Sequence, residues 1–293
     1  MVLTHFGVAV HSLPSRREFD RLVRRADELD YDVIATPDHL GRPAPFALLA
    51  AAALITSRLR LRTYMLNSAF WNPAMLAREA ATVDVLSDGR LELGLGAGHM
   101  KTEFDDAGIA WSPLDERLAW LERTVADLQR RLADHAPAPV QQPVPIAIGA
   151  MSLAGLTVAA RHADIVGFAG LRQATGAPPG TFTIAGPKHL AGMVDHVRTV
   201  AAGRPYRSDA LLQVVAIGEP QKAAGSIAAK VPELTVDDVL TSPFVLLAGS
   251  AEAAAAQLLQ RQETYGIDSW TTHEPNLEVF GEVIAAYRAH RAP

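Results

Sequence analysis

The sequence contains no cysteine among its 293 residues, so disulfides, thiolate metal sites and cysteine nucleophiles are excluded. Charge of one sign is also not concentrated anywhere along the chain. Lys and Arg number 27 against 32 Asp and Glu, a net charge of −5, with no run long enough to form a basic stripe or an acidic tail. Nucleic acid is therefore not an expected partner.

Signals for export or membrane insertion are likewise missing. The first ten residues, MVLTHFGVAV, lack a basic segment followed by an apolar one. No run approaches the roughly 18 apolar residues of a membrane span, although FALLAAAALI, Phe46–Ile55, is strongly apolar over the length of a helix. We expect a cytoplasmic protein with some buried helices, a small-molecule substrate and no membrane partner.

Short β-branched or Leu-rich runs alternate with longer segments of helical periodicity, which is typical of βα units around a parallel sheet. The predicted strands are Thr4–Val10, Asp32–Thr36, Leu59–Leu66, Leu91–Gly96, Pro145–Ile148, Asp164–Phe168, Leu211–Ile217 and Ser269–His273. The predicted helices are Arg16–Leu29, Phe46–Ser57, Pro73–Leu86, Asp115–Ala133, Ser152–Arg161, Lys188–Ala202, Ala251–Tyr265 and Asn276–Arg291. Eight such pairs predict an α/β fold, a (β/α)8 TIM barrel formed by a single domain over residues 1–293. A doubly wound open sheet is the alternative, because periodicity does not reveal closure.

Three stretches interrupt this alternation. They are a Pro-rich connector at Asp134–Pro145, an irregular loop at Gly170–Pro187 and a mostly helical segment at Gly218–Pro243. We therefore expect insertions after strands 5 to 7 of the barrel. The second and third stretches follow the carboxyl ends of strands, where barrel active sites are built.

Polar residues follow several predicted strands. In IATPDHL, Asp38 and His39 come directly after the second strand, where a carboxylate could orient a proton-exchanging imidazole; a capping Asp beside a surface His is the equal alternative. Asn67 ends the third strand and could meet a ligand. His11 and His273 follow the first strand and end the eighth, so both could face the cleft, although each residue alone is more often structural. No H-E-x-x-H or G-x-S-x-G motif occurs, so neither a metal site nor a serine hydrolase is expected.

The segment SDGRLELGLGAGHM, Ser87–Met100, is rich in glycine. Asp88-Gly89 is a tight turn into the fourth strand, and Gly94, Gly96 and Gly98 remove side chains from one face and from the strand tip. A bulky ligand can then come close; close backbone packing inside a narrow barrel is the alternative. The spacing is not the dinucleotide fingerprint, which opens a helix after a first strand.

A second glycine-containing junction follows the fifth strand. Gly149 and Ala150 stand just before Ser152 and a predicted helix. The unpaired N–H groups of a helix N-terminus suit a phosphate, although any αβ protein has such junctions.

Taken together, four segments resemble the bacterial luciferase-like monooxygenase superfamily over almost the whole chain: DVIATPDHL, LRLRTYMLNSAFWNPAMLAREAATVDVLSDGRLELGLGAGHMKTEFDDAGI, VPIAIGAMS with AARHADIVGF, and SPFVLLAGSAEAAAAQLLQRQETYGIDSW. The order of motifs in Pro73–Ile109 is the most specific part. The resemblance implies a (β/α)8 barrel, commonly dimeric, that binds FMN or the deazaflavin coenzyme F-420 at its mouth. The Asp38-His39 pair, in place of Glu-His-His, favours coenzyme F-420.

The resemblance also implies roles for individual residues. It places Asp38 and His39 beside the redox ring, with a non-prolyl cis peptide at Tyr64-Met65 behind it. Phosphate contacts come from the backbone of Gly149, Ala150 and Met151, where Ala150 replaces a second glycine and makes a left-handed conformation less comfortable. Asn67, Gly96 and Gly98 complete the predicted cofactor contacts. His99 stands where the related glucose-6-phosphate dehydrogenases carry a catalytic glutamate, so their substrate is not carried over.

The sequence thus predicts a coenzyme F-420-dependent oxidoreductase that transfers a hydride between the cofactor and an unidentified organic substrate. His39, oriented by Asp38, is the first proton-handling candidate and His99 the second. His11, His99 and His273 are the predicted substrate-binding residues. An FMN-dependent monooxygenase that uses reduced flavin and oxygen is one alternative, and a non-catalytic flavin-binding protein is the other.

Overall fold

A parallel β-barrel forms the centre of the molecule in the computed structural model, which describes residues 4–178, 180–231 and 233–291. Its strands follow the order β3-β2-β1-β13-β10-β7-β6-β5-β4, and additional pairing of β3 with β5 closes the sheet. The bounds are β1 His5–Ala9, β2 Val33–Thr36, β3 Arg60–Thr63, β4 Leu66–Asn67, β5 Leu91–Gly96, β6 Ile146–Ala150, β7 Ile165–Phe168, β10 Arg207–Leu212 and β13 Ser269–His273. Since β3 and β4 are two parts of one barrel strand, the predicted (β/α)8 barrel is confirmed.

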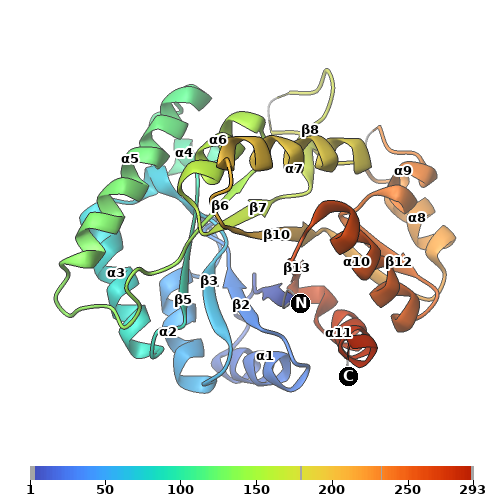
Figure 1. The fold of residues 1–293 in the computed structure, drawn as a ribbon, viewed down its shortest axis with the longest axis horizontal. Helices are drawn as coiled ribbons and strands as arrows, with labels where there is room; N and C mark the ends of the chain where they lie inside the picture. Colours follow the sequence, from blue (N-terminus) through green and yellow to red (C-terminus); the bar gives the residue numbers. More distant parts are fainter. Residues whose placement is uncertain (1–3, 179, 232, 292–293) are drawn as a thin grey trace.

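Helices surround the barrel (Figure 1). They are α1 Arg16–Glu28, α2 Pro45–Ile55, α3 Pro73–Leu86, α5 Leu114–Ala133, α6 Leu153–His162, α7 Pro187–Ala201, α10 Ala251–Tyr265 and α11 Leu277–Arg291. Their starts follow from local chemistry: Asn72 accepts a hydrogen bond from the Ala74 N–H ahead of Pro73, and Ser250 caps α10 in the same way through Ala253. In the described residues, no helix is long and apolar enough to cross a membrane.

The seventh barrel strand differs from the prediction. Leu211–Ile217 was predicted as one strand, but β10 occupies Arg207–Leu212 in the barrel, and β11, Val214–Ile217, leaves it to pair in parallel with β12, Val245–Ala248. The reason is the barrel interior: Asp209 of β10 is fully buried there, so this strand lacks the continuous apolar run that the neighbouring β11 has.

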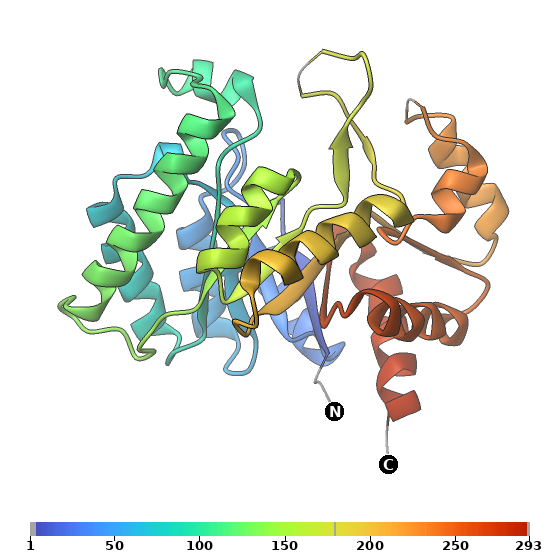
Figure 2. The same cartoon turned by 45° about the horizontal axis from the view of Figure 1, so that its top comes forward.

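The insertions gather at one end of the barrel. The irregular loop Gly170–Pro187 contains an antiparallel hairpin of β8, Leu171–Gln173, and β9, Phe182–Ile184. The predicted helical segment Gly218–Pro243 holds α8, Pro220–Ala228, and α9, Val236–Thr241. The insertion predicted after strand 5 is wrong, since β6 passes to α6 through Met151 and Ser152 alone. Figure 2 shows the hairpin and the α8–α9 segment projecting away from the end where both termini lie.

Candidate active site at the barrel mouth

Asp38 follows β2 and accepts two hydrogen bonds from the next barrel strand and its loop. Its Oδ2 atom lies 2.9 Å from Trp71 Nε1 and 3.1 Å from the backbone nitrogen of Asn67. Burial raises the pKa of Asp38, and these two hydrogen bonds oppose the rise. The predicted orientation of His39 by Asp38 is therefore wrong: this carboxylate instead ties the loop after β4 to the loop after β2.

His39 has a different carboxylate partner, Glu103. The Nδ1 atom of His39 lies 2.8 Å from Glu103 Oε1, on the short helix α4, Lys101–Asp106, that follows β5. The pair is half-buried, with 34% and 15% of the two side chains exposed. Sequence reasoning missed Glu103 because 64 positions separate it from His39. A carboxylate on Nδ1 sets the ring orientation and leaves Nε2 as the nitrogen for proton exchange.

His99 packs against both sides of the mouth. Its ring centroid lies 5.6 Å from that of His39 and 5.8 Å from that of Phe182 on the β8–β9 hairpin, both edge to face. The side chain keeps solvent exposure, but the protein atoms packed around the ring, followed by the charge of His39, lower its pKa to about 4. His99 is then neutral at pH 7.

His11 and His273 form a second histidine pair at the ends of β1 and β13. Their Nε2 and Nδ1 atoms lie 2.9 Å apart. Glu274 holds the β1 loop by accepting hydrogen bonds from the N–H groups of His11 and Ser12, at 2.9 and 3.0 Å. Burial, followed by the charge of His11, lowers the pKa of His273 to about 4. The structure thus brings together the two histidines that the sequence placed separately at the cleft.

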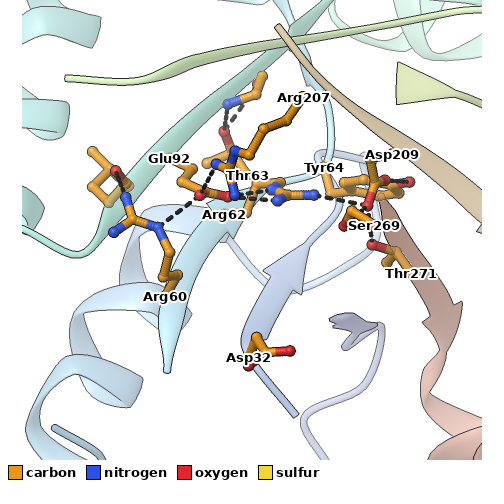
Figure 3. Close-up of polar contacts among 12 residues, drawn as sticks. Asp32, Arg60, Arg62, Thr63, Tyr64, Glu92, Arg207, Asp209, Ser269 and Thr271 are labelled. Atoms are coloured by element: carbon orange, nitrogen blue, oxygen red, sulfur yellow. Dashed lines mark hydrogen bonds and ion pairs between the residues drawn. The ribbon is translucent and has the colours of Figure 1, made fainter. Parts of the chain in front are cut away.

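The third barrel strand is broken at Tyr64-Met65, where the predicted cis peptide is confirmed. Tyr64 points into the barrel and donates its hydroxyl to Asp209 Oδ2 at 2.6 Å (Figure 3). Met65 lies against backbone that carries no side chains: a Cβ atom built on Gly149 would approach its Cγ to 2.9 Å, and one on Gly167 its Cε to 3.1 Å. The glycines of adjacent strands therefore leave room for Met65.

Gly94 and Gly98 serve close packing in the same region. A Cβ atom on Gly94 would come within 1.9 Å of the Thr63 carbonyl oxygen, and one on Gly98, where φ is +74°, within 2.7 Å of Phe104. Only Gly96 has looser surroundings, with Met65 Cβ at 3.5 Å. Close backbone packing, the alternative explanation for these glycines, therefore applies to Gly94 and Gly98. Their contact with a ligand stays a prediction.

An ionic network lies beside Tyr64 in the barrel interior (Figure 3). Arg62 is fully buried between Glu92 of β5, at 2.6 Å, and Asp209 of β10, at 3.1 Å. Arg60 and Arg207 also contact Glu92, at 2.6 and 2.5 Å. Although burial opposes ionisation, the charges of Arg62 and then Arg207 hold the pKa of Glu92 well below its usual range. The network joins three barrel strands under the mouth.

The junction after β6 places backbone N–H donors at the start of α6. Ser152 caps α6 by accepting a hydrogen bond from the Gly155 N–H at 3.2 Å, and the first N–H groups of a helix have no intrahelical acceptor. Ala150 does not adopt a left-handed conformation but ends β6 as an ordinary strand residue. The substitution for a second glycine is therefore accommodated without backbone strain.

Comparisons with known proteins identify relatives of this chain. An F-420-dependent glucose-6-phosphate dehydrogenase of Kribbella flavida is 38% identical over 117 residues, 37% of this chain and 35% of the relative. The oxygenase component of a flavin-dependent trigonelline monooxygenase of Acinetobacter baylyi is 34% identical over 148 residues, 44% of this chain and 41% of the relative. The chain thus matches about two fifths or less of these curated relatives' length.

A solved structure shares the fold over nearly the full length. The coenzyme F-420-dependent tetrahydromethanopterin reductase of Methanopyrus kandleri superposes with a TM-score of 0.74 at 17% identity and covers 97% of this chain and 99% of its own. The family model described as luciferase-like monooxygenase matches residues 1–178, which contain β1 to β7 and most of the mouth. The chain therefore belongs to the luciferase-like monooxygenase family.

Proposed function

We propose that this protein is a coenzyme F-420-dependent oxidoreductase that acts on a small organic molecule at the barrel mouth. The observation that carries the proposal is the arrangement around Asp38-His39. Asp38 is engaged by Trp71 and Asn67, so His39 and Glu103 form a separate proton-handling pair beside the loops after β4 and β5. The similarity to an F-420-dependent relative supports the same assignment.

The residues of the mouth fit such a cofactor. Met65 is held in a slot lined by Gly149 and Gly167, and the N-terminus of α6 supplies N–H donors for a phosphate, from Met151 and the residues after it. We propose that Met65, Asn67 and Gly96 lie against the ring and that Gly149, Ala150 and Met151 bind the phosphate. When bound, the deazaflavin supplies the hydride-exchanging carbon, while the protein supplies binding and orientation.

We assign separate roles to His39, His99 and Phe182 at the mouth. His39 exchanges a proton at Nε2, and the Glu103 carboxylate on Nδ1 stabilises the imidazolium that results. His99 stays neutral at pH 7 because its pKa is near 4, so it serves as a hydrogen-bonding group and not as a cation. Phe182 of the hairpin packs edge to face against the His99 ring, with centroids 5.8 Å apart, and so fixes its position beside the mouth.

Calorimetric titration of the purified protein with oxidised coenzyme F-420 and, separately, with FMN tests the proposal. We expect tight binding of coenzyme F-420 and at least tenfold weaker binding of FMN, since the Asp-His pair is typical of the deazaflavin branch. Tight binding of FMN with no binding of coenzyme F-420 would refute the proposal.

An FMN-dependent monooxygenase is the second candidate, favoured by the similarity to the trigonelline monooxygenase component. The two functions differ in oxygen chemistry, because reduced FMN reacts with oxygen and the reduced deazaflavin does so poorly. An oxygen electrode therefore separates them. Oxygen uptake that the protein accelerates in the presence of reduced FMN supports the monooxygenase; unchanged uptake supports the proposed deazaflavin enzyme.

A further inference from the structure

Gln213 sets the protonation pattern of the histidine pair at the ends of β1 and β13. Its Nε2 atom donates to the carbonyl oxygen of Ala169 at 2.7 Å, so its Oε1 atom is the acceptor on the other side of the amide. His273 Nε2 faces that Oε1 atom at 3.4 Å. A nitrogen that faces an acceptor carries the proton, and therefore His273 is protonated on Nε2.

The tautomer of His273 determines that of His11. In a neutral imidazole with a proton on Nε2, Nδ1 is an acceptor. His273 Nδ1 lies 2.9 Å from His11 Nε2, so His11 Nε2 must be the donor. The proton of neutral His11 is then on Nε2, and its Nδ1 carries a lone pair. In the described part of the chain no hydrogen bond to His11 Nδ1 is found, and this atom is absent from the buried atoms without a partner, so it keeps solvent access and can meet a ligand.

The charges around His11 keep this lone pair available at neutral pH. Burial lowers the pKa of His11, Glu274 raises it, and Arg42 and His39 lower it again, with a net downward shift from 6.5. His273 packs against the ring from β13 and is itself neutral at pH 7. Because its pKa is lowered, His11 is neutral at pH 7.5 and keeps an acceptor at Nδ1.

We infer that His11 Nδ1 recognises a hydroxyl group of the substrate, so that this face of the mouth selects alcohols over the matching ketones. A hydroxyl donates to the lone pair, whereas a carbonyl oxygen opposes it and leaves a half-buried acceptor unpaired. This inference rests on the proposed function for the identity of the site as a substrate site. His11 acts here as a specificity-determining residue, separate from the His39–Glu103 pair.

The first test measures the tautomers by NMR of the ¹⁵N-labelled protein without added cofactor, through two-bond nitrogen correlations of the imidazole rings. We expect His11 and His273 both with the proton on Nε2. His135 is the internal control with the opposite tautomer, because its Nδ1 atom lies 3.1 Å from the carbonyl oxygen of Pro137 and must donate. A proton on Nδ1 of His11 at pH 7.5 overturns the inference.

The second test compares three ligands with the same five-membered ring, cyclopentanol, cyclopentanone and methoxycyclopentane, titrated into the protein with the His11 resonances as the readout. At pH 7.5 we expect the alcohol to bind about tenfold more tightly than the ketone or the ether, as one unpaired acceptor implies. Acidification until the His11 resonances show a proton on Nδ1 should remove the preference, because an N–H group donates to the oxygen of all three ligands. Equal affinities at pH 7.5, or no binding of any of the three, overturn the inference.

Variants separate this inference from the proposed function. His11→Phe should abolish the preference for the alcohol. His135→Phe, at a half-buried site in the connector before β6, should leave it unchanged. Thermal unfolding checks that both variants are folded. If the parent protein binds coenzyme F-420 but shows no preference for the alcohol, the inference alone is refuted. A retained preference without coenzyme F-420 binding refutes the proposed function and leaves His11 as a hydroxyl-binding residue.

Discussion

Replacement of Asp209 by Asn tests the role of the ionic network under the mouth. The Asp209 carboxylate receives four contacts: Arg62 Nη1 at 3.1 Å, the Tyr64 hydroxyl at 2.6 Å, and the hydroxyls of Ser269 and Thr271 at 2.6 and 2.8 Å. The amide keeps the shape and can still accept from Ser269 and Thr271. It loses the negative charge beside Arg62 and places an N–H group opposite the Tyr64 hydroxyl.

The loss of stability in this variant follows from burial, because Asp209 and Arg62 are both fully inaccessible to solvent. Removal of one member of a buried ion pair destabilises a protein by about 3 to 5 kcal/mol, and the isosteric amide places this variant near the lower end. At about 2 °C per kcal/mol for a chain of this size, Asp209→Asn should lower the Tm by roughly 6 °C. Coenzyme F-420 affinity should fall as well, since Tyr64 orients Met65.

Differential scanning calorimetry of the parent and the variant at pH 7 measures the first effect. Asp20→Asn is the matched control, because Asp20 contacts Arg24 on the exposed surface of α1 and its loss should leave the Tm unchanged. A Tm of Asp209→Asn within about 2 °C of the parent, at unchanged unfolding enthalpy, would show that the network does not stabilise the barrel as argued.

Three further predictions concern other parts of the molecule. Glu103→Gln should lower turnover by about 100-fold near pH 7 at unchanged Tm, because His39 loses the carboxylate that stabilises its charged form; unchanged turnover in steady-state assays would contradict the role of this pair. Gly94→Ala should destabilise the fold by about 3 kcal/mol or more in urea unfolding, because the added Cβ atom meets the Thr63 carbonyl oxygen. Gly192→Ala, within α7 and with open space around it, should instead stabilise the fold by about 0.5 kcal/mol. Similar effects of the two variants would contradict the packing argument. The free energy of unfolding should fall as pH decreases from about 6.5 towards 4, because His99 and His273, with folded pKa values of about 4, bind protons at lower pH than the unfolded chain does. His273→Gln should make this pH dependence less steep in urea titrations. An unchanged pH dependence would contradict the burial of the His273 ring.

The barrel could be predicted because local sequence patterns determine the helices on its outer face. Helices such as Ala251–Tyr265 carry a cap, a periodic apolar face and a terminal glycine, and the structure confirms both bounds of this helix. The interior of the barrel has no such pattern. Arg60 and Arg62 alternate with leucines as they would on a half-exposed strand, and only the closed sheet shows that their polar face meets Glu92 and Asp209. The strand β10 was misplaced for the same reason.

The site shows the same division between local and distant information. Asp38, His39, His99, His11 and His273 all stand at strand ends, so their position at the mouth followed from strand assignment. Their partners did not, because Glu103, Trp71 and Gln213 come from loops and helices whose approach depends on the closed barrel. Sequence proximity suggested that Asp38 orients His39, but each of the two side chains is held by a residue from another element.

The assignment of the cofactor is tested most directly by a crystal structure of the protein grown with equal concentrations of oxidised coenzyme F-420 and FMN. The account predicts density for coenzyme F-420 alone, with its ring between Met65 and His39 and its phosphate at the backbone of Met151 and the N-terminus of α6. Density for FMN in the mouth, or a deazaflavin phosphate bound away from α6, would contradict it.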